Sequence, residues 1–379
     1  MIKRWRHIES LAQLRAQLAA GEDLRGCVLQ GLDLRELSVS TFPQVAGAVF
    51  LGCRLAVGDD ALLLEGGAML FPNLGEGRPY QPYRPRLYSV SELMEGFDGN
   101  RAGTFEDTRD SKIYRHFQDF RAQQPAPIME ALAQRIHDHA IDDALGALLA
   151  PAGGTPRRVV GIMGGHAMHR GEADYRQIAE IARQLTHQGY FVATGGGPGA
   201  MEAGNLGAWM AGYSEAELGA AVAQLAGCVD YREHDYLVRG YRVLADYPTG
   251  KESLSIPTWF YGHEPSNQFA THIAKYFSNS LREDGLLAIA KHGVIYAPGS
   301  AGTVQEVFMD AAQNHYGTFE VVSPMVFLGT REWTETRPVL PLLEQLAGTK
   351  RYRELIAAVD SVEAAVRFIV EHPPVPYTG

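Results

Sequence analysis

The second half of the chain alternates short apolar runs with amphipathic stretches. Each apolar run is almost uniformly hydrophobic, as is typical of a strand buried on both faces of a parallel sheet. The stretches between the runs carry apolar residues at helical spacing, for example Tyr175, Ile178, Ala182 and Leu185. This alternation predicts an α/β fold, with a parallel sheet covered by helices on both faces. The expected strands are residues 158–163, 190–194, 254–260, 293–297 and 324–328.

Residues 1–150 follow a different, mixed pattern. We expect an opening helix over 8–20, followed by leucines five residues apart at Leu24, Leu29 and Leu34. That spacing indicates short β-coil turns, but too few of them to predict a solenoid, which needs several stacked units to bury a core. The other elements expected here are an irregular connection over 71–88 and helices over 104–122 and 127–149.

The segment PAGGTPRR at residues 151–158 is the expected domain boundary, because Pro and Gly break both helices and strands. We therefore expect an N-terminal region of unknown role over 1–150 and an α/β domain over 151–335. Residues 336–379 are predicted to form two C-terminal helices that pack on this domain.

The composition narrows the class of protein. With 46% hydrophobic and 21% charged residues, the chain is typical of a globular protein. A net charge of −10 would repel a nucleic-acid backbone. The sequence has no apolar run long enough to span a membrane and no signal peptide, so we expect a cytoplasmic protein without a membrane partner. Neither the three cysteines nor any other grouping has the spacing of a metal site.

The loop TGGGPGAMEA at residues 194–203 follows a predicted strand and opens a predicted helix. Its glycines let backbone N–H groups approach an anion beside a helix N-terminus, which suits a phosphate. The alternative is a tight strand-to-helix turn with no ligand. The candidate phosphate- or substrate-binding residues here are Gly195, Gly196, Gly197, Gly199 and Glu202.

The same loop formally fits the dinucleotide fingerprint G-x-G-x-x-A. That fingerprint expects an acidic residue about twenty positions on, at the end of a second strand. Ser214 and Glu217 occupy that region with the spacing of a helix-capping box, which disfavours NAD.

A second strand, small-residue loop and helix occur at YAPGSAGTVQEV, residues 296–307. Gly299, Ser300 and Gly302 can present a nest of backbone donors, and Thr303 adds a hydroxyl. Glu306 then falls on the first turn of the helix. The alternative is that Thr303 and Glu306 form a capping box, whose only role is to satisfy backbone N–H groups.

Both loops follow strands of one parallel sheet, and ligands of such Rossmann-like sheets bind outside the carboxyl ends of the strands. Arg282 precedes the second motif and suits bidentate recognition of phosphate, although an ion pair with Glu283 or Asp284 would explain it equally well. The lysine of a P-loop is missing, which argues against ATP-driven phosphoryl transfer. Further candidate ligand contacts are Gly164, Gly165, His166, His263 and Asn279. In the segment YGHEPSN, His263 and Glu264 are candidates to bind a sugar or a base, and the alternative is that Pro and Asn make a turn there.

The pair TGGGPGAMEAGNLGA and APGSAGTVQEV resembles the LOG (Lonely guy) family of phosphoribohydrolases, whose motif is PGGxGTxxE. The run from IPTWFYGHEPSN through YAPGSAGTVQEVFMDAAQNHY resembles the bacterial pyrimidine/purine nucleotide 5'-monophosphate nucleosidases even more. This resemblance covers residues 155–330. Ser300 replaces the second glycine of the motif, which restricts the backbone conformations open to the loop.

The resemblance implies hydrolysis of the N-glycosidic bond of a nucleoside 5'-monophosphate, giving free base and ribose 5-phosphate. Glu306 and Arg282 match the family's catalytic glutamate and arginine, and Gly299, Gly302 and Thr303 match its phosphate-binding turn. Glu306 would stabilise positive charge on the ribose, while Arg282 would hold the phosphate or stabilise the departing base. The resemblance implies no metal or organic cofactor and at least a homodimer.

Two other functions remain open. A nucleotide sensor or carrier would use the same loops to bind a ligand without cleaving it. A pyridoxal-phosphate lysine decarboxylase, suggested by old labels of the family, would need a Schiff-base lysine, for which the α/β region offers Lys251, Lys275 and Lys291 without a recognisable context.

Overall fold

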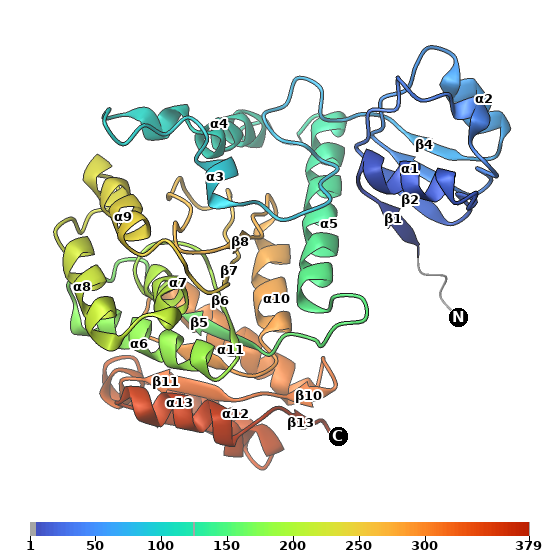
Figure 1. Cartoon of the computed structure of the whole chain (residues 1–379). Helices are drawn as coiled ribbons and strands as arrows, with labels where there is room; N and C mark the ends of the chain where they lie inside the picture. The colour runs from blue at the N-terminus through green and yellow to red at the C-terminus, as the bar shows by residue number, and fades with distance from the viewer. Residues whose placement is uncertain (1–4, 124–125, 379) are drawn as a thin grey trace. The chain divides into compact units, whose positions relative to one another are not determined.

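The computed structural model describes residues 5–123 and 126–378. The chain divides into two compact units (Figure 1). Unit 1 comprises residues 1–87 with 115–148, and unit 2 comprises residues 88–114 with 149–379. Residues 88–114, which the sequence pattern places in the N-terminal region, are thus part of the α/β unit. No helix in the described ranges is long and apolar enough to cross a membrane.

Unit 1 is built from stacked β-coils. Its four strands form a parallel sheet in the order β1-β2-β3-β4, with helical segments between them. In register, Ile8 pairs with Leu29 and Leu29 with Phe50, so one turn takes about 21 residues, a period typical of solenoids. The elements are β1 (Arg6–Ile8), α1 (Leu11–Ala19), β2 (Cys27–Gln30), η1 (Val39–Thr41), β3 (Val49–Leu51), α2 (Asp59–Glu65) and β4 (Met69–Phe71).

This stack corrects the expectation that the region has too few repeats to be a solenoid. Leu24, Leu29 and Leu34 are all fully buried, but their five-residue spacing lies within one turn and is not the repeat that stacks. The two helices expected after this region are α4 (Arg109–Arg121), preceded by the 3-10 turn η2 (Thr104–Asp107), and α5 (Ile128–Leu149).

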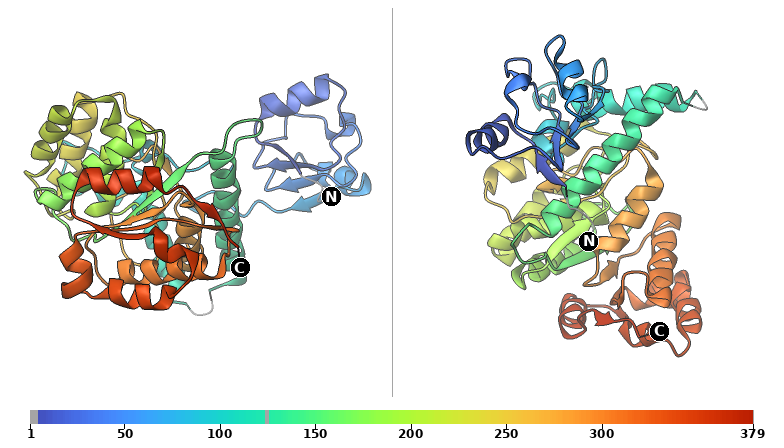
Figure 2. Two further views of the ribbon diagram at one scale, coloured as in Figure 1. Left: turned by 90° about the horizontal axis from the view of Figure 1, so that it is seen from below. Right: turned by 90° about the vertical axis from the view of Figure 1, so that its right-hand side faces the viewer.

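Unit 2 is an α/β fold with a seven-stranded parallel sheet in the order β12-β11-β9-β5-β6-β7-β8. Helices cover both faces: α6 packs against α7 and α13 on one side, and α11 packs against α10 and α12 on the other (Figure 2). This architecture confirms the predicted fold class. The strands are β5 (Val159–Met163), β6 (Phe191–Thr194), β7 (Leu254–Ser255), β8 (His272–Ile273), β9 (Val294–Tyr296), β11 (Met325–Leu328) and β12 (Ile356–Val359). The main helices are α6 (Ala173–His187), α7 (Ala200–Trp209), α8 (Glu215–Leu225), α9 (His234–Asp246), α10 (Asn279–Ile289), α11 (Ala301–Tyr316), α12 (Val339–Ala347) and α13 (Val362–Glu371).

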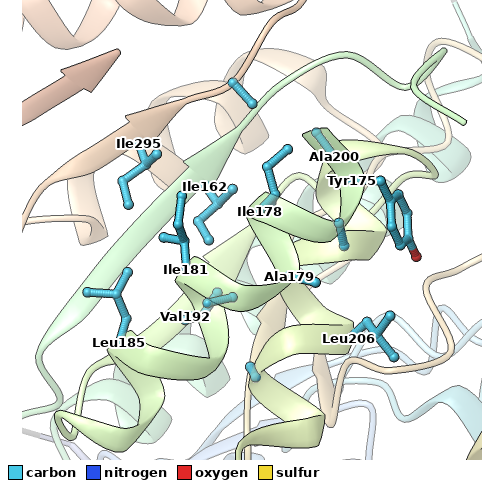
Figure 3. Close-up of a cluster of buried hydrophobic side chains, with 14 of the residues drawn as sticks. Ile162, Tyr175, Ile178, Ala179, Ile181, Leu185, Val192, Ala200, Leu206 and Ile295 are labelled. Carbon is cyan, nitrogen blue, oxygen red and sulfur yellow. The ribbon is translucent and has the colours of Figure 1, made fainter. Parts of the chain in front are cut away.

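The main core of unit 2 lies between α6, α7 and the central strands (Figure 3). Ile178 and Leu185 of α6 pack with Ile162 of β5, Val192 of β6 and Ile295 of β9, and all five side chains are fully buried. Burial of such side chains contributes about 1.5–3 kcal/mol each and holds the carboxyl ends of neighbouring strands in fixed positions.

Two segments differ from their predicted structure. Only residues 254–255 of the expected strand 254–260 form a regular strand. Pro257 lacks an N–H group, and beyond it the pairing continues as an isolated parallel bridge between Thr258 and Tyr276. Residues 336–379 supply the strands β12 and β13 (Val375–Pro376) as well as two helices. The sequence IAAV of β12 is half-buried at the sheet edge and only four residues long, so its pattern is weak.

Candidate functional site

Unit 2 contains a cavity of about 610 Å³ outside the carboxyl ends of the adjacent strands β9, β5, β6 and β7. This is where ligands bind in open α/β sheets. Among the residues predicted to contact a ligand, those that line it are Gly164, Gly165, His166, Gly195, Gly196, Gly197, His263, Arg282, Ser300, Gly302, Thr303 and Glu306. The predicted residues outside the cavity wall are Gly199, Glu202, Asn279 and Gly299.

The β6–α7 loop, residues 195–199, is closely packed against its surroundings. Gly196 has φ of +79°, and a Cβ placed on it would lie 2.9 Å from both Pro257 Cδ and Ser255 Cβ. Gly199 has φ of +69°, and a Cβ there would collide with the carbonyl oxygen of Gly165. Both positions require glycine for backbone conformation and space, so part of this glycine run serves the turn itself.

Glu202, on the first turn of α7, lies behind this loop and is 3% exposed. Its carboxylate accepts hydrogen bonds from Nε and Nη2 of Arg170 at 2.8 and 2.6 Å. The hydroxyls of Tyr175 and Tyr236 donate to it at 2.8 and 2.9 Å. Four hydrogen-bond donors of the protein thus occupy the acceptor sites of this carboxylate. It links α7 to Tyr175 of α6 and Tyr236 of α9, and few acceptor sites are left for a ligand.

The glutamate that follows the β9–α11 loop, Glu306, is not used to cap the helix. Helix α11 begins after Ser300, which is the N-cap residue, and no side chain caps its backbone. Thr303 and Glu306 therefore do not form the capping box that their spacing allows, because the helix begins one turn earlier than that motif requires. Glu306 instead lines the cavity, together with Ser300, Gly302 and Thr303.

Arg282, near the start of α10, lies opposite Glu306. Arg282 Nη1 and Glu306 Oε1 are 3.5 Å apart, and the two side chains are 13% and 15% exposed. Within the described ranges, Nε of Arg282 is buried and makes no hydrogen bond. The ion pair with Glu283 or Asp284 that would make Arg282 an ordinary surface residue is not formed among the described contacts. Among the described contacts the guanidinium makes a hydrogen bond only to Glu306, and Arg282 lines the cavity, so its remaining Nη donors are available beside it.

Burial has a strong effect on Glu306. Removal of the carboxyl group from water raises its pKa to about 7, although the charge of Arg282 acts in the opposite direction. A carboxyl group with this pKa exists in both protonation states near neutral pH, as a proton-transfer group must.

Of the three Schiff-base candidates, Lys275 lines the cavity. Its Nζ lies 2.8 Å from both carboxylate oxygens of Asp110, which also accepts hydrogen bonds from Trp259 Nε1 and Ser266 Oγ. This buried ion pair holds residues 88–114 against the β7–β8 region of the same unit. Lys251 and Lys291, the other Schiff-base candidates, do not line the cavity.

His263 is held by stacking rather than left loose on a loop. Its ring lies between those of Phe105 and Tyr114, with centroids 4.5 and 4.6 Å away, and its Nε2 is 2.6 Å from Ser111 Oγ. Asn279 does not line the cavity, but its Nδ2 donates to the hydroxyl of Tyr261, a residue of the cavity wall, at 2.9 Å.

Several cavity residues were not predicted, because no motif singles out their side chains. They include Tyr231 and Tyr261 in loops, Glu283 in α10 and Gln305 in α11. Glu264, the neighbour of His263 in the YGHEPSN segment, lines the cavity. Within the described part of the chain, no three His, Cys, Asp or Glu side chains are grouped so as to hold a metal ion.

Comparisons with known proteins give structural similarity only. No family model matches the chain, and no curated protein matches it. The solved structures that it resembles include the molybdenum cofactor binding protein of the phototrophic bacterium Rippkaea orientalis, with 14% identity and a TM-score of 0.36. They also include the Moco carrier protein of Chlamydomonas reinhardtii, with 16% identity and a TM-score of 0.35. Each alignment covers 57% of this chain and 98% of the other. At this level of similarity, no property of those proteins is carried over to this chain.

Proposed function

We propose that this protein hydrolyses the N-glycosidic bond of a nucleoside 5'-monophosphate, releasing the free base and ribose 5-phosphate. The observation that carries the proposal is the facing pair of Arg282 and Glu306 beside a glycine-containing helix start. The resemblance of the two sequence motifs to the LOG phosphoribohydrolases supports the same reaction.

In this proposal the 5'-phosphate lies at the β9–α11 loop. The N-terminus of α11 favours an anion, and Arg282 has guanidinium donors available beside it. Ser300 and Thr303 add hydroxyl groups on the same wall of the cavity. The ribose then extends from the phosphate past Glu306.

The bond that breaks joins C1' of the ribose to a nitrogen of the base, and its electron pair leaves with the base. Positive charge develops on the ribose ring, and the Glu306 carboxylate stabilises that charge. The oxygen of a water molecule bonds to C1', and Glu306 accepts a proton from this water. The proton that Glu306 accepts passes through solvent to the departing nitrogen, so the water molecule is divided between the C1' hydroxyl and the free base, and Glu306 is ionised again.

The test is to incubate the purified protein with a panel of nucleoside monophosphates and their parent nucleosides, and to follow free base by chromatography. We expect base release from monophosphates, little from nucleosides, and its loss in Glu306→Gln and Arg282→Ala. Binding of a monophosphate without base release over hours would reject the enzyme and favour a sensor or carrier.

The same assay identifies the preferred base, and light scattering determines the oligomeric state. The family resemblance predicts at least a homodimer, in which a neighbouring subunit completes the site. A fully active monomer, identified by light scattering at assay concentration, would reject that prediction.

A further inference from the structure

Asp310 is a buried carboxyl group that the reaction described above does not use. It lies on α11 four residues after Glu306, and residues at this spacing are neighbours on one helical face, with about 5–6 Å between their Cβ atoms. Asp310 is 4% exposed, and its Oδ2 accepts a hydrogen bond from the hydroxyl of Tyr296 at 2.8 Å. Its Oδ1 accepts a longer one from Nδ2 of Asn314 at 3.3 Å. Two neutral donors thus bind a carboxyl group one turn behind the proposed base.

Asp310 differs from the other buried carboxyl groups of residues 5–123 and 126–378, because no Lys, Arg or His lies beside it. The other buried carboxyl groups all have such a partner: Asp110 with Lys275, Glu130 with Arg78, Asp138 with His137, Glu180 with Arg183 and Glu202 with Arg170. A buried carboxylate without a cation is costly, which favours the protonated form. Burial accordingly raises the pKa of Asp310 to about 7, although the hydrogen bond from Tyr296 acts in the opposite direction.

Tyr296 connects Asp310 to Glu306. It is the last residue of β9, directly before the β9–α11 loop, and its buried ring stacks on that of Phe327 with centroids 5.1 Å apart. Burial raises the pKa of its hydroxyl, and the charges of Asp310 and Glu306 raise it further. The hydroxyl therefore lies within the electrostatic reach of both carboxyl groups, in surroundings where water does not screen their charges.

The charged groups around this cluster come from α10. Arg282 lowers the pKa of Glu306 and Glu283 raises it, both more weakly than burial does. Among the described contacts, α12 and β10 (Val321–Val322), which also pack against α11, bring no charged side chain to Asp310. Two buried carboxyl groups therefore depend on one nearby cation, Arg282, so ionisation of either group makes ionisation of the other less favourable.

We propose that Asp310 is a positioning residue for Glu306: the two carboxyl groups form one coupled acid–base pair across Tyr296, and the negative charge of Asp310 makes Glu306 a stronger base. This rests on the proposed function, in which Glu306 accepts a proton from the attacking water. Asp310 does not line the cavity and acts only through Glu306. Its effect is to make proton transfer to Glu306 more favourable near neutral pH.

Titration of Glu306 by 13C NMR, in the full chain labelled at the glutamate carboxyl carbon, tests this coupling without substrate. The resonance of Glu306 is identified by its absence in Glu306→Gln. In Asp310→Asn, loss of the neighbouring charge should move the titration midpoint of Glu306 to a pH about 0.5–1.5 lower than in the wild type. The rise in the rate of base release with pH should move in the same direction. A thermal melt of the variant verifies that it is folded.

Tyr296→Phe tests the connection between the two groups. It removes the hydrogen bond that favours ionised Asp310, so Asp310 keeps its proton to higher pH and the midpoint of Glu306 should also fall. Asp310→Asn should then move the midpoint less in the Tyr296→Phe background than in the wild type. Equal displacements in the two backgrounds would overturn the role of Tyr296 in the coupling.

Asp284→Asn is the matched control, because it removes the same charge from an exposed position of α10, where water screens it. Its Glu306 midpoint should stay within about 0.2 pH units of the wild type. A purely structural role would lower the melting temperature of Asp310→Asn without moving the midpoint of Glu306. That result, or an equal displacement in Asp284→Asn, would overturn the proposal.

The result is separable from that of the proposed function, since the NMR titration needs neither substrate nor turnover. A displaced midpoint in a protein that releases no base would reject the hydrolase and leave the coupling of Asp310 to Glu306 intact. Base release by the wild type, with an unchanged midpoint in Asp310→Asn, would reject the coupling alone.

Discussion

The segments β6–α7 and β9–α11 have the same plan but use their glutamates in opposite ways. Each runs from a buried strand through a glycine-containing loop into a helix with a glutamate near its start. Glu202 is enclosed by Arg170 and two tyrosines, whereas Glu306 faces the cavity with one 3.5 Å contact. The first segment therefore serves to hold the fold together, and the second leaves its carboxylate available for chemistry.

Glu202→Gln should have the largest effect of the changes that test this contrast. It leaves the buried Arg170 without its counter-ion, which costs about 3–5 kcal/mol of the free energy of unfolding. Urea denaturation measures the loss. Glu215→Gln, at a side chain that is 68% exposed, should change stability by less than about 0.5 kcal/mol. Equal free energies of unfolding for the two variants would show that Glu202 does not stabilise the fold.

Glu306→Gln should affect activity without weakening the fold. Loss of a charge that stabilises the transition state lowers the rate of base release by about 10²–10³-fold. The free energy of unfolding should not fall, because the variant removes a carboxyl group that burial already penalises. A variant that is both unstable and inactive would mean that Glu306, like Glu202, serves the fold.

The pH dependence follows from the same carboxyl group. The pKa of Glu306 is about 7 in the folded protein and near the ordinary glutamate value of 4.5 when unfolded, so the folded state retains its proton at higher pH. Stability from this group is complete below pH 4.5 and is lost as pH rises through 7, by up to about 3 kcal/mol. The free energy of unfolding should therefore differ less between pH 5 and pH 8 in Glu306→Gln than in the wild type.

The rate of base release should rise as the pH increases through 7, because the ionised form of Glu306 is the active one. A fall in the rate over that range would contradict a role for ionised Glu306.

Two glycines of the cavity wall should also differ in their tolerance of alanine. Gly196→Ala forces a Cβ against Ser255 and Pro257 and should cost about 1–3 kcal/mol of stability. Gly302→Ala meets nothing within 4 Å and lies in the first turn of α11, so stability should stay constant or rise by up to about 1 kcal/mol. Thermal melting compares the two variants, and equal losses would show that Gly302 is as constrained as Gly196.

The sequence predicts the sheet well because five of its strands are continuous apolar runs between helices of regular period. It misses β8, which has only two residues, and β12, which is half-buried at an edge. The stacked coils of unit 1 are missed for a different reason. Their repeat of about 21 residues is carried by a few pairs such as Leu29 and Phe50, with little sequence identity between turns.

For the site, the sequence predicts both loops, Arg282 and Glu306. It does not show that Glu202 is enclosed by other side chains whereas Glu306 faces the cavity. That distinction depends on Arg170, Tyr175 and Tyr236, whose convergence is a tertiary property. For Glu264 the segment YGHEPSN indicates either a ligand contact or a turn, and only the tertiary structure shows that the side chain lines the cavity.

The most direct test of the central claim is to quantify base and ribose 5-phosphate together after incubation with the preferred monophosphate, for wild type and Glu306→Gln. The account predicts that the wild type forms the two products in equal amounts. It also predicts that Glu306→Gln binds the monophosphate but forms about 10²–10³-fold less of both. Tight binding by both proteins with no product from either, or equal rates from both, would contradict the account.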